Sequence, residues 1–169
     1  MSYPPLLYPV ELSDLPGAPF SDAVVLLAGE RIRDECGWHI APSVTETLTV
    51  GVDCGRAFLP SMRVTAVSAV RDVTGTSPVV IPASAWRWRK TITAVDISRC
   101  GVETIEVDIT HGYDTCPTAL LGRAAELARR IGRGGDVRSE QVGGVAYSYA
   151  AGATDDDAAL LKYALPVIA

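Results

Sequence analysis

The chain has 169 residues, of which 48% are hydrophobic and 21% are charged. These proportions are ordinary for a folded protein and exclude wholesale disorder, and the length suits one domain with a real core. The formal net charge of -5 argues against a protein whose main task is to grip nucleic acid, because such proteins carry a basic excess. We expect neither a membrane span nor a signal peptide, since no apolar run is long enough and the proline-rich start lacks a basic leader.

The first predicted elements are an arm and a helix. Residues 1–20 contain five prolines and should run extended over a surface, that of the same chain or of a neighbour. Ser21 and Asp22 then form an N-cap pair that opens a helix over about 22–36, which Gly37 ends. We place its apolar stripe on Val24, Leu27, Ala28 and Ile32, mixed with Arg31 and Glu35.

The period of the sequence changes to two over about 44–110, which predicts an antiparallel β-rich insertion. Residues 44–50 alternate apolar side chains with threonine, and residues 51–55 read as a hairpin turn leading to a short return strand at 56–59. Residues 102–110 form the clearest strand.

Residues 86–92 predict a strand with tryptophans on one face and cations on the other. Aromatic rings beside cations can bind single-stranded nucleic acid by stacking. A period of two, however, sends Trp86 and Trp88 to the opposite face from Arg87 and Arg89, so we predict buried tryptophans and a solvated basic face that ends at Lys90. The charged residues of the segment 1–60 are in contrast mostly acidic. Such an asymmetry of charge along the chain suits docking between copies of the chain, but it also arises by chance on solvated faces.

The best helix of the sequence is predicted over 117–131, with Pro117 in its first turn. Its apolar stripe is broad enough to be buried, and we place four arginines on the other face: Arg123, Arg129, Arg130 and Arg133. Residues 133–169 should then form a glycine-rich linker, an extended arm or hairpin, and a short helix over about 155–165. Three aspartates open that helix, and helix-start chemistry explains them without a cation site.

Candidate catalytic groups are few, and we predict that the protein is not an enzyme. No phosphate-binding loop, dinucleotide fingerprint or nucleophile elbow occurs. His111 with Tyr113 and Asp114 could be drawn as an acid–base trio, but a strand-to-helix turn explains these residues as well. His39 could shuttle protons, although packing beside Trp38 is the expected role.

We predict no metal and no cofactor. The cysteines contain no CxxC pair, show no zinc-site spacing with the two histidines, and are expected as free thiols. They are Cys36, Cys54, Cys100 and Cys116.

Taken in order, these pieces resemble the head-to-tail adaptor (connector) proteins of long-tailed double-stranded DNA bacteriophages, especially those that infect actinobacteria. The resemblance covers roughly residues 20–165, and its most specific phrases are THGYD before Pro117 and RSEQVGGVAYSY after the helix. It implies an α+β fold, a single domain over 1–169, in which a small helical adaptor domain carries the β-rich insertion.

The resemblance also implies a structural virion protein of the neck, present in the host cytoplasm during assembly. Such adaptors form a ring, typically dodecameric, under the portal protein, and extend the channel through which packaged DNA passes without sequence-specific binding. They offer an attachment surface to the next neck protein, a stopper, or to a tail terminator. The C-terminal segment of such adaptors reaches toward the portal, which here implies the docking residues Ser139, Glu140, Gln141, Val142, Gly143, Gly144, Val145, Tyr147 and Tyr149.

Two other classes stay open. The chain could be a different neck or tail-completion protein, a stopper or a tail terminator, which the β-rich middle favours. It could also be a small phage enzyme, for which a nucleophile–base pair is the feature to find.

Overall fold

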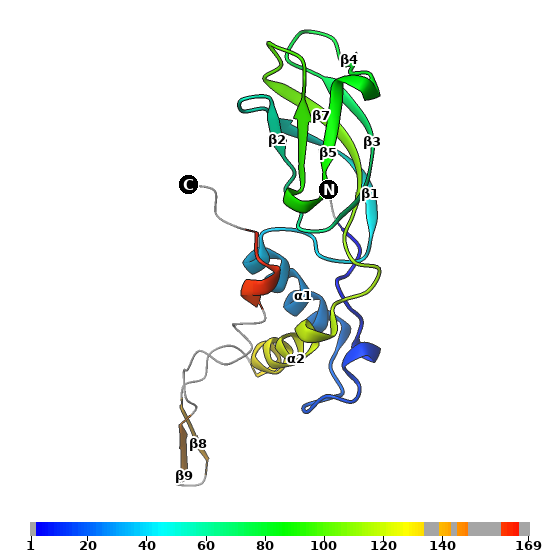
Figure 1. Cartoon of the computed structure of the whole chain (residues 1–169). Coiled ribbons are helices and arrows are strands. Elements are labelled where there is room, and N and C mark those ends of the chain that lie inside the picture. The colour runs from blue at the N-terminus through cyan, green and yellow to red at the C-terminus, as the bar shows by residue number, and fades with distance from the viewer. Residues whose placement is uncertain (1–2, 134–138, 143–144, 149–159, 166–169) are drawn as a thin grey trace. The chain divides into compact units, whose positions relative to one another are not determined.

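The computed structural model describes residues 3–133, 139–142, 145–148 and 160–165 (Figure 1). These residues form two compact units. Among the described residues the helical unit consists of the chain up to Gly37 together with the chain from Thr115 to residue 165, and the β unit consists of Trp38–Asp114. Helices and antiparallel sheets are both present, so the predicted α+β class is confirmed.

The helical unit is built on α1 (Asp22–Cys36) and α2 (Thr118–Gly132). α1 begins after Ser21 and ends at Gly37, which adopts the left-handed conformation with φ 76°, as its sequence signals predict. Pro117 is the N-cap of α2 rather than a residue of its first turn. Residues 155–159 of the predicted last helix lie outside the described residues, and residues 160–163 are helical.

The buried face of α1 matches the predicted stripe only in part, at Ala28 and Ile32. Val25, Ala28, Gly29 and Ile32 are buried, whereas Leu27 is 56% exposed. The cause is the N-terminal segment, because a Cβ added to Gly29 would lie only 3.2 Å from the Cβ of Leu6. Small residues let this segment approach the helix closely, and periodicity alone does not reveal a partner that lies elsewhere in the chain.

The N-terminal segment packs on the helical unit of its own chain. Leu6, Leu7 and Leu12 are buried, and residues Pro9–Leu12 form a 3-10 turn, η1. Arg33 holds the segment from α1, since its Nη2 donates a hydrogen bond of 2.6 Å to the carbonyl oxygen of Pro4.

Because Val25 is buried and Leu27 is exposed on α1, we expect two alanine substitutions to differ in their effect on stability. Val25→Ala should lower the free energy of unfolding by roughly 2 kcal/mol, because it removes two buried methyl groups and leaves a small cavity. Leu27→Ala should change it by less than about 0.5 kcal/mol, as is usual at an exposed position. Urea unfolding of both variants checks this, and equal losses would contradict the observed burial.

α2 also departs from its predicted pattern at one arginine. Arg123 was predicted on the solvent face but is buried. Its guanidinium lies 3.2 Å from a carboxylate oxygen of Glu126 and 3.6 Å from one of Glu35 on α1. These two carboxylates compensate the buried charge, which is the condition under which an arginine can be buried.

The β unit contains two antiparallel sheets. The larger one has the strand order β1-β7-β3-β4, with bounds Val44–Gly51, Thr104–His111, Val64–Asp72 and Val79–Val80. The smaller one has the order β2-β6-β5, with bounds Arg56–Phe58, Ala94–Ile97 and Trp86–Arg89. Two 3-10 turns flank β5, η2 (Ala83–Ala85) and η3 (Lys90–Ile92).

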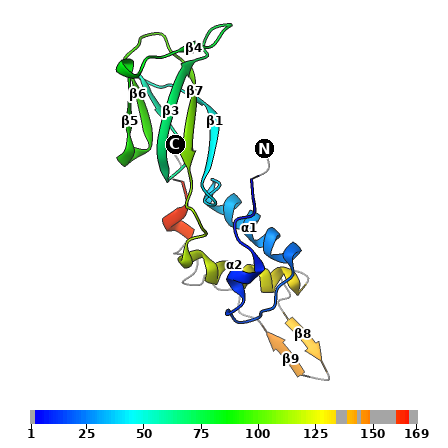
Figure 2. The same ribbon diagram turned by 90° about the vertical axis from the view of Figure 1, so that its right-hand side faces the viewer.

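The two sheets of the β unit lie as layers over a common core (Figure 2). Alternate residues of the central strand β7, namely Ile105, Val107 and Ile109, are fully buried. They belong to one cluster with Val95 and Ile97 of the small sheet. The period-two patterning of the sequence therefore points one face of each sheet inward.

The predicted hairpin at residues 51–55 is wrong in its pairing. A tight turn exists there, with hydrogen bonds of 2.8 Å exchanged between the backbones of Asp53 and Arg56. It joins strands of different sheets, however, because β1 pairs with β7 over its whole length and β2 pairs with β6. Alternation identifies a strand but not its partner.

Candidate assembly surfaces

The outer face of the small sheet gathers cations in a regular arrangement. Cross-strand register places Arg56, Asp96 and Arg87 in one row across the three strands. The next row contains Phe58, Ala94 and Arg89.

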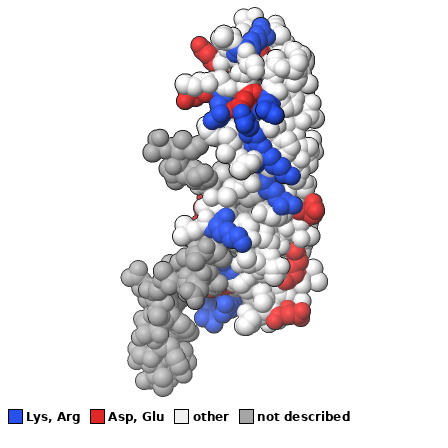
Figure 3. Space-filling model, viewed as in Figure 1, with Lys and Arg blue, Asp and Glu red and all other residues white. Residues whose placement is uncertain are grey.

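Lys90 and Ile92 follow Arg89 in the turn η3, and Phe58 and Ile92 are 47% and 44% exposed. We call this surface the cationic face, and Figure 3 shows its Lys and Arg side chains as a band with one acidic spot among them. It consists of Arg56, Phe58, Arg87, Arg89, Lys90 and Ile92.

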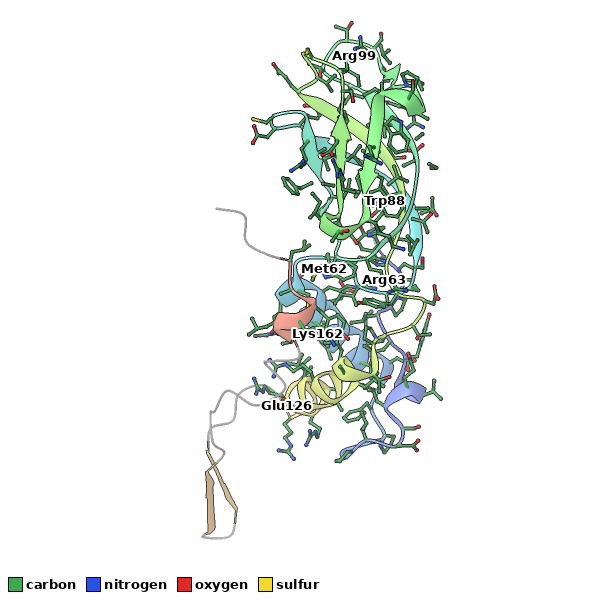
Figure 4. The ribbon with its side chains drawn as sticks, in the orientation of Figure 1. Met62, Arg63, Trp88, Arg99, Glu126 and Lys162 are labelled. Carbon is green, nitrogen blue, oxygen red and sulfur yellow. The ribbon has the colours of Figure 1, made fainter. Side chains whose placement is uncertain are left out.

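The inward side of β5 carries the two tryptophans, as predicted. Trp86 and Trp88 are half-buried and pack against the core cluster, whereas Arg87 and Arg89 are exposed. Trp88 is labelled in Figure 4 on β5. Because rings and cations lie on opposite sides of the strand, stacking of bases between them is excluded.

Asp96 organises the cationic face. Its Oδ1 accepts a hydrogen bond of 2.7 Å from Arg56 Nε, and its Oδ2 accepts one of 2.6 Å from Arg89 Nε. These two arginines hold the pKa of Asp96 below its ordinary value of 3.8. Within the described residues Arg87 and Lys90 form no ion pair, so they are the uncompensated charges of the face.

The lowered pKa of Asp96 predicts how stability depends on pH. A carboxyl group with a lower pKa in the folded state stabilises the fold above its unfolded pKa, and this contribution is lost as the pH falls through the folded value. Asp96→Asn should therefore lose less stability than the parent chain between about pH 5 and about pH 2. Thermal unfolding across this range checks the prediction, and equal losses in the two proteins would contradict it.

The outer face of the larger sheet differs because its central carboxylate, Asp108, is paired with Arg71. Asp108 on β7 accepts hydrogen bonds of 2.8 Å from Arg71 and 2.7 Å from Thr47, which hold its pKa below the ordinary range. Thr45 and Thr110 bond to each other at 2.8 Å across β1 and β7. This face therefore offers mainly hydroxyl groups, and its remaining carboxylate, Glu106, forms no ion pair with the described residues.

The histidines lie buried in the β unit. His111 is 2% exposed, and its Nε2 lies 2.7 Å from Oε1 of Glu46, which is 8% exposed. The His39 ring packs beside it with a centroid distance of 5.0 Å. His111 is thus paired with Glu46 in a pair closed off from solvent, and this arrangement gives no support to the acid–base trio drawn from the sequence.

Three of the four cysteines, Cys36, Cys54 and Cys116, are poorly suited to nucleophilic chemistry. All four are free, and burial raises the pKa of Cys36 to about 11 and that of Cys116 to about 12. A hydrogen bond to Asp53 raises the pKa of the exposed Cys54. Because the thiolate is the reactive form, these groups stay in the inert thiol form near neutral pH. Among the described residues no three His, Cys, Asp or Glu side chains gather closely enough to hold a metal ion.

The predicted docking residues fall on a small hairpin. Strands β8 (Ser139–Val142) and β9 (Val145–Ser148) pair antiparallel, with Glu140 opposite Tyr147 in the backbone register. Gly143, Gly144 and Tyr149 lie outside the described residues.

In the part of the chain that the structure describes, no helix is long and apolar enough to cross a membrane.

Three residues of the cationic face were not predicted from the sequence: Arg56, Phe58 and Ile92. Arg56 and Phe58 flank the inward Ala57 on β2, and that alternation was the available signal. It could not show that β2 joins β5 through β6, which brings Arg56 into the row of Arg87.

The sequence matches no protein-family model and no curated protein. The fold, in contrast, matches solved structures over nearly the whole chain. A chain from the neck of an empty gene transfer agent (GTA) particle, computed with C6 symmetry, superposes with a TM-score of 0.62 at 19% identity, covering 96% of this chain and 92% of that one.

A second match comes from the neck of a native GTA particle, computed with C12 symmetry. It superposes with a TM-score of 0.56 at 18% identity and covers 86% of this chain and 82% of that one. At these identities the likeness establishes a shared fold. This protein thus has, over nearly its whole length, the α+β fold of chains found in a GTA particle neck.

Proposed function

We propose that the protein is a structural component of the neck of a phage-like particle, located at the junction of head and tail. The observation that carries this proposal is the end-to-end match in fold to a chain of a GTA neck, which covers 96% of this chain and 92% of that one. The resemblance of THGYD and RSEQVGGVAYSY to phage adaptors supports the same role from an independent direction, the sequence. The actinobacteriophage type implied by those phrases stays a prediction, since the structural matches are to a GTA particle.

Within the neck we propose the adaptor role. The protein docks as a homo-oligomeric ring under the portal protein, extends the DNA channel and presents a surface to the next neck protein. The C12 symmetry of one matched neck is consistent with a dodecameric ring. The buried Glu46–His111 pair and the inert buried thiols agree with a structural rather than an enzymatic role.

The second candidate is a stopper or tail terminator. The observation that favours it is the size of the β unit, which spans Trp38–Asp114 and therefore nearly half of the chain. The two roles differ in what the protein binds first: an adaptor binds the head vertex, whereas a terminator caps the tail tube.

The β8–β9 hairpin is the proposed portal-docking arm. Replacing residues 139–148 with a Gly-Ser linker of equal length should leave thermal unfolding within about 2 °C of the parent, because the described backbone bonds of these strands are made within the hairpin. It should also abolish binding to heads. Cosedimentation with heads measures this, and undiminished binding would remove the docking role from the hairpin.

The experiment that tests the neck role uses DNA-filled heads that lack this protein. Purified protein is added to such heads and, separately, to isolated tails, and bound subunits are counted by quantitative mass spectrometry after sedimentation. The adaptor role predicts binding to heads alone, and binding to tails alone would assign the terminator role. Binding to neither would overturn the neck proposal.

A further inference from the structure

The solvent-facing side of α1 is an exposed stripe of aliphatic and acidic residues. Asp22, Leu26, Glu30 and Asp34 recur every four residues and therefore line up along the helix. Leu26 and the adjacent Leu27 are 46% and 56% exposed. We call these five residues the acidic face.

The charges of the acidic face are only partly compensated within the chain. Glu30 pairs with Arg33 at 2.8 Å. In the described residues Asp22 and Asp34 form no ion pair. The helix therefore presents two leucines between free carboxylates near its two ends.

The cationic face has the opposite charge and a similar composition. It exposes two large apolar side chains, Phe58 and Ile92, beside two cations without an ion pair, Arg87 and Lys90. Stable interfaces combine an apolar centre with a charged rim of matching sign. Each face thus supplies what the other lacks.

DNA is a less suitable occupant of the cationic face. Asp96 lies in the middle of the face between Arg56 and Arg89, where it would meet phosphate groups, and the exposed Phe58 and Ile92 find no partner on a phosphate backbone. The acidic face of a second copy meets both the cations and the apolar side chains.

We propose that neighbouring subunits contact each other through these two surfaces, with the acidic face of one copy against the cationic face of the next. The inference rests on the proposed function, because it names the contact that builds the ring. Two different faces make a head-to-tail contact, and such contacts close into a ring when the rotation between copies closes. The proposed contact accounts for the exposed leucines on α1. It also accounts for the acidic excess in one part of the sequence and the basic excess in another.

The test uses two full-length variants whose charges are reversed on one face each. Arg87→Glu with Lys90→Glu reverses the cationic face, and Asp22→Lys with Asp34→Lys reverses the acidic face. None of these four residues forms an ion pair with the described residues, so the fold should be retained. Asp14→Lys with Asp114→Lys is the control, because these exposed residues lie outside both faces and form no ion pair with the described residues.

Each variant alone should load at least about tenfold fewer subunits onto heads than the parent chain, because every contact then opposes like charges. A mixture of the two in equal amounts should restore loading to within about twofold, since intact faces meet each other and reversed faces also meet with opposite sign. The control variant should load like the parent. Restoration by mixing also shows that both variants are folded.

Two further sets of results would contradict these expectations. Normal loading by either variant alone, or no restoration in the mixture, would overturn the proposed contact while the neck role stands. If the parent chain does not bind heads at all, the proposed function fails instead.

In that case carbodiimide coupling of concentrated protein still decides the contact. It should link Lys90 of one copy to Glu30 or Asp34 of another, identified with a mixture of nitrogen-14 and nitrogen-15 protein. The absence of such a link would overturn the inference.

Discussion

Gly112→Ala should lower the free energy of unfolding by about 2 to 5 kcal/mol. Gly112 follows β7 with a φ of 101°, a conformation that side chains with a Cβ rarely adopt. A Cβ at this position would lie 2.7 Å from Nε2 of the buried His39 and 3.0 Å from the carbonyl oxygen of Pro42. Neither neighbour can withdraw without moving the packed loop, so backbone strain and overpacking add together.

Gly101→Ala is the matched control for this substitution. Gly101 also has a positive φ, of 77°, but no atom lies within 4 Å of the added Cβ. Its loss should be limited to the backbone preference, about 1 to 2 kcal/mol. Chemical denaturation of both variants gives the difference, and equal losses would mean that the surroundings of Gly112 yield more easily than the structure indicates.

Breaking the buried Glu46–His111 pair should have the second largest effect. His111→Leu should cost about 3 to 5 kcal/mol, because it leaves the Glu46 carboxyl group buried without this partner. Glu46→Leu should be costly for the same reason, since it removes the group that lies 2.7 Å from His111 Nε2.

A double-mutant cycle separates the pair from its surroundings. Replacing both residues with leucine should cost less than the sum of the two single losses, because neither member of the pair then stays buried without the other. Urea unfolding of the four proteins yields the coupling energy. Additive losses would show that the two side chains do not interact strongly, contrary to the observed distance.

Local signals in the sequence predicted the element bounds well. Ser21 and Gly37 fix the ends of α1 because capping and left-handed backbone are properties of single residues. The inward tryptophans of β5 were predicted for a similar reason, since alternation depends only on neighbouring residues.

What the sequence did not predict depends on partners far along the chain. The buried Gly29 lies against Leu6, and the buried Arg123 pairs with Glu35. Periodicity cannot locate either partner, and so it placed Leu27 inside and Arg123 outside. Arg56 lies on the cationic face because β2 and β5 both pair with β6, and no local pattern specifies this strand order. The hydrophobic pattern shows that a helix or strand is amphipathic, whereas the tertiary fold decides which of its residues are covered.

The exposed residues, rather than the core, therefore carry the functional argument. Leu26 and Leu27 are prominent on α1 because a helix normally buries such side chains against its own core. Phe58 on β2 and Ile92 in η3 are likewise large apolar side chains exposed to solvent. For a proposed ring subunit, these are the side chains that a neighbouring copy would cover.

The most direct test of the neck role is electron cryo-microscopy of heads reconstituted with this protein, with the vertex reconstructed under several cyclic symmetries. The account predicts a ring of additional density directly under the portal that accepts the fold of the helical unit and the β unit in every subunit. Density at the tail end instead, or a vertex identical to that of heads without the protein, would contradict it.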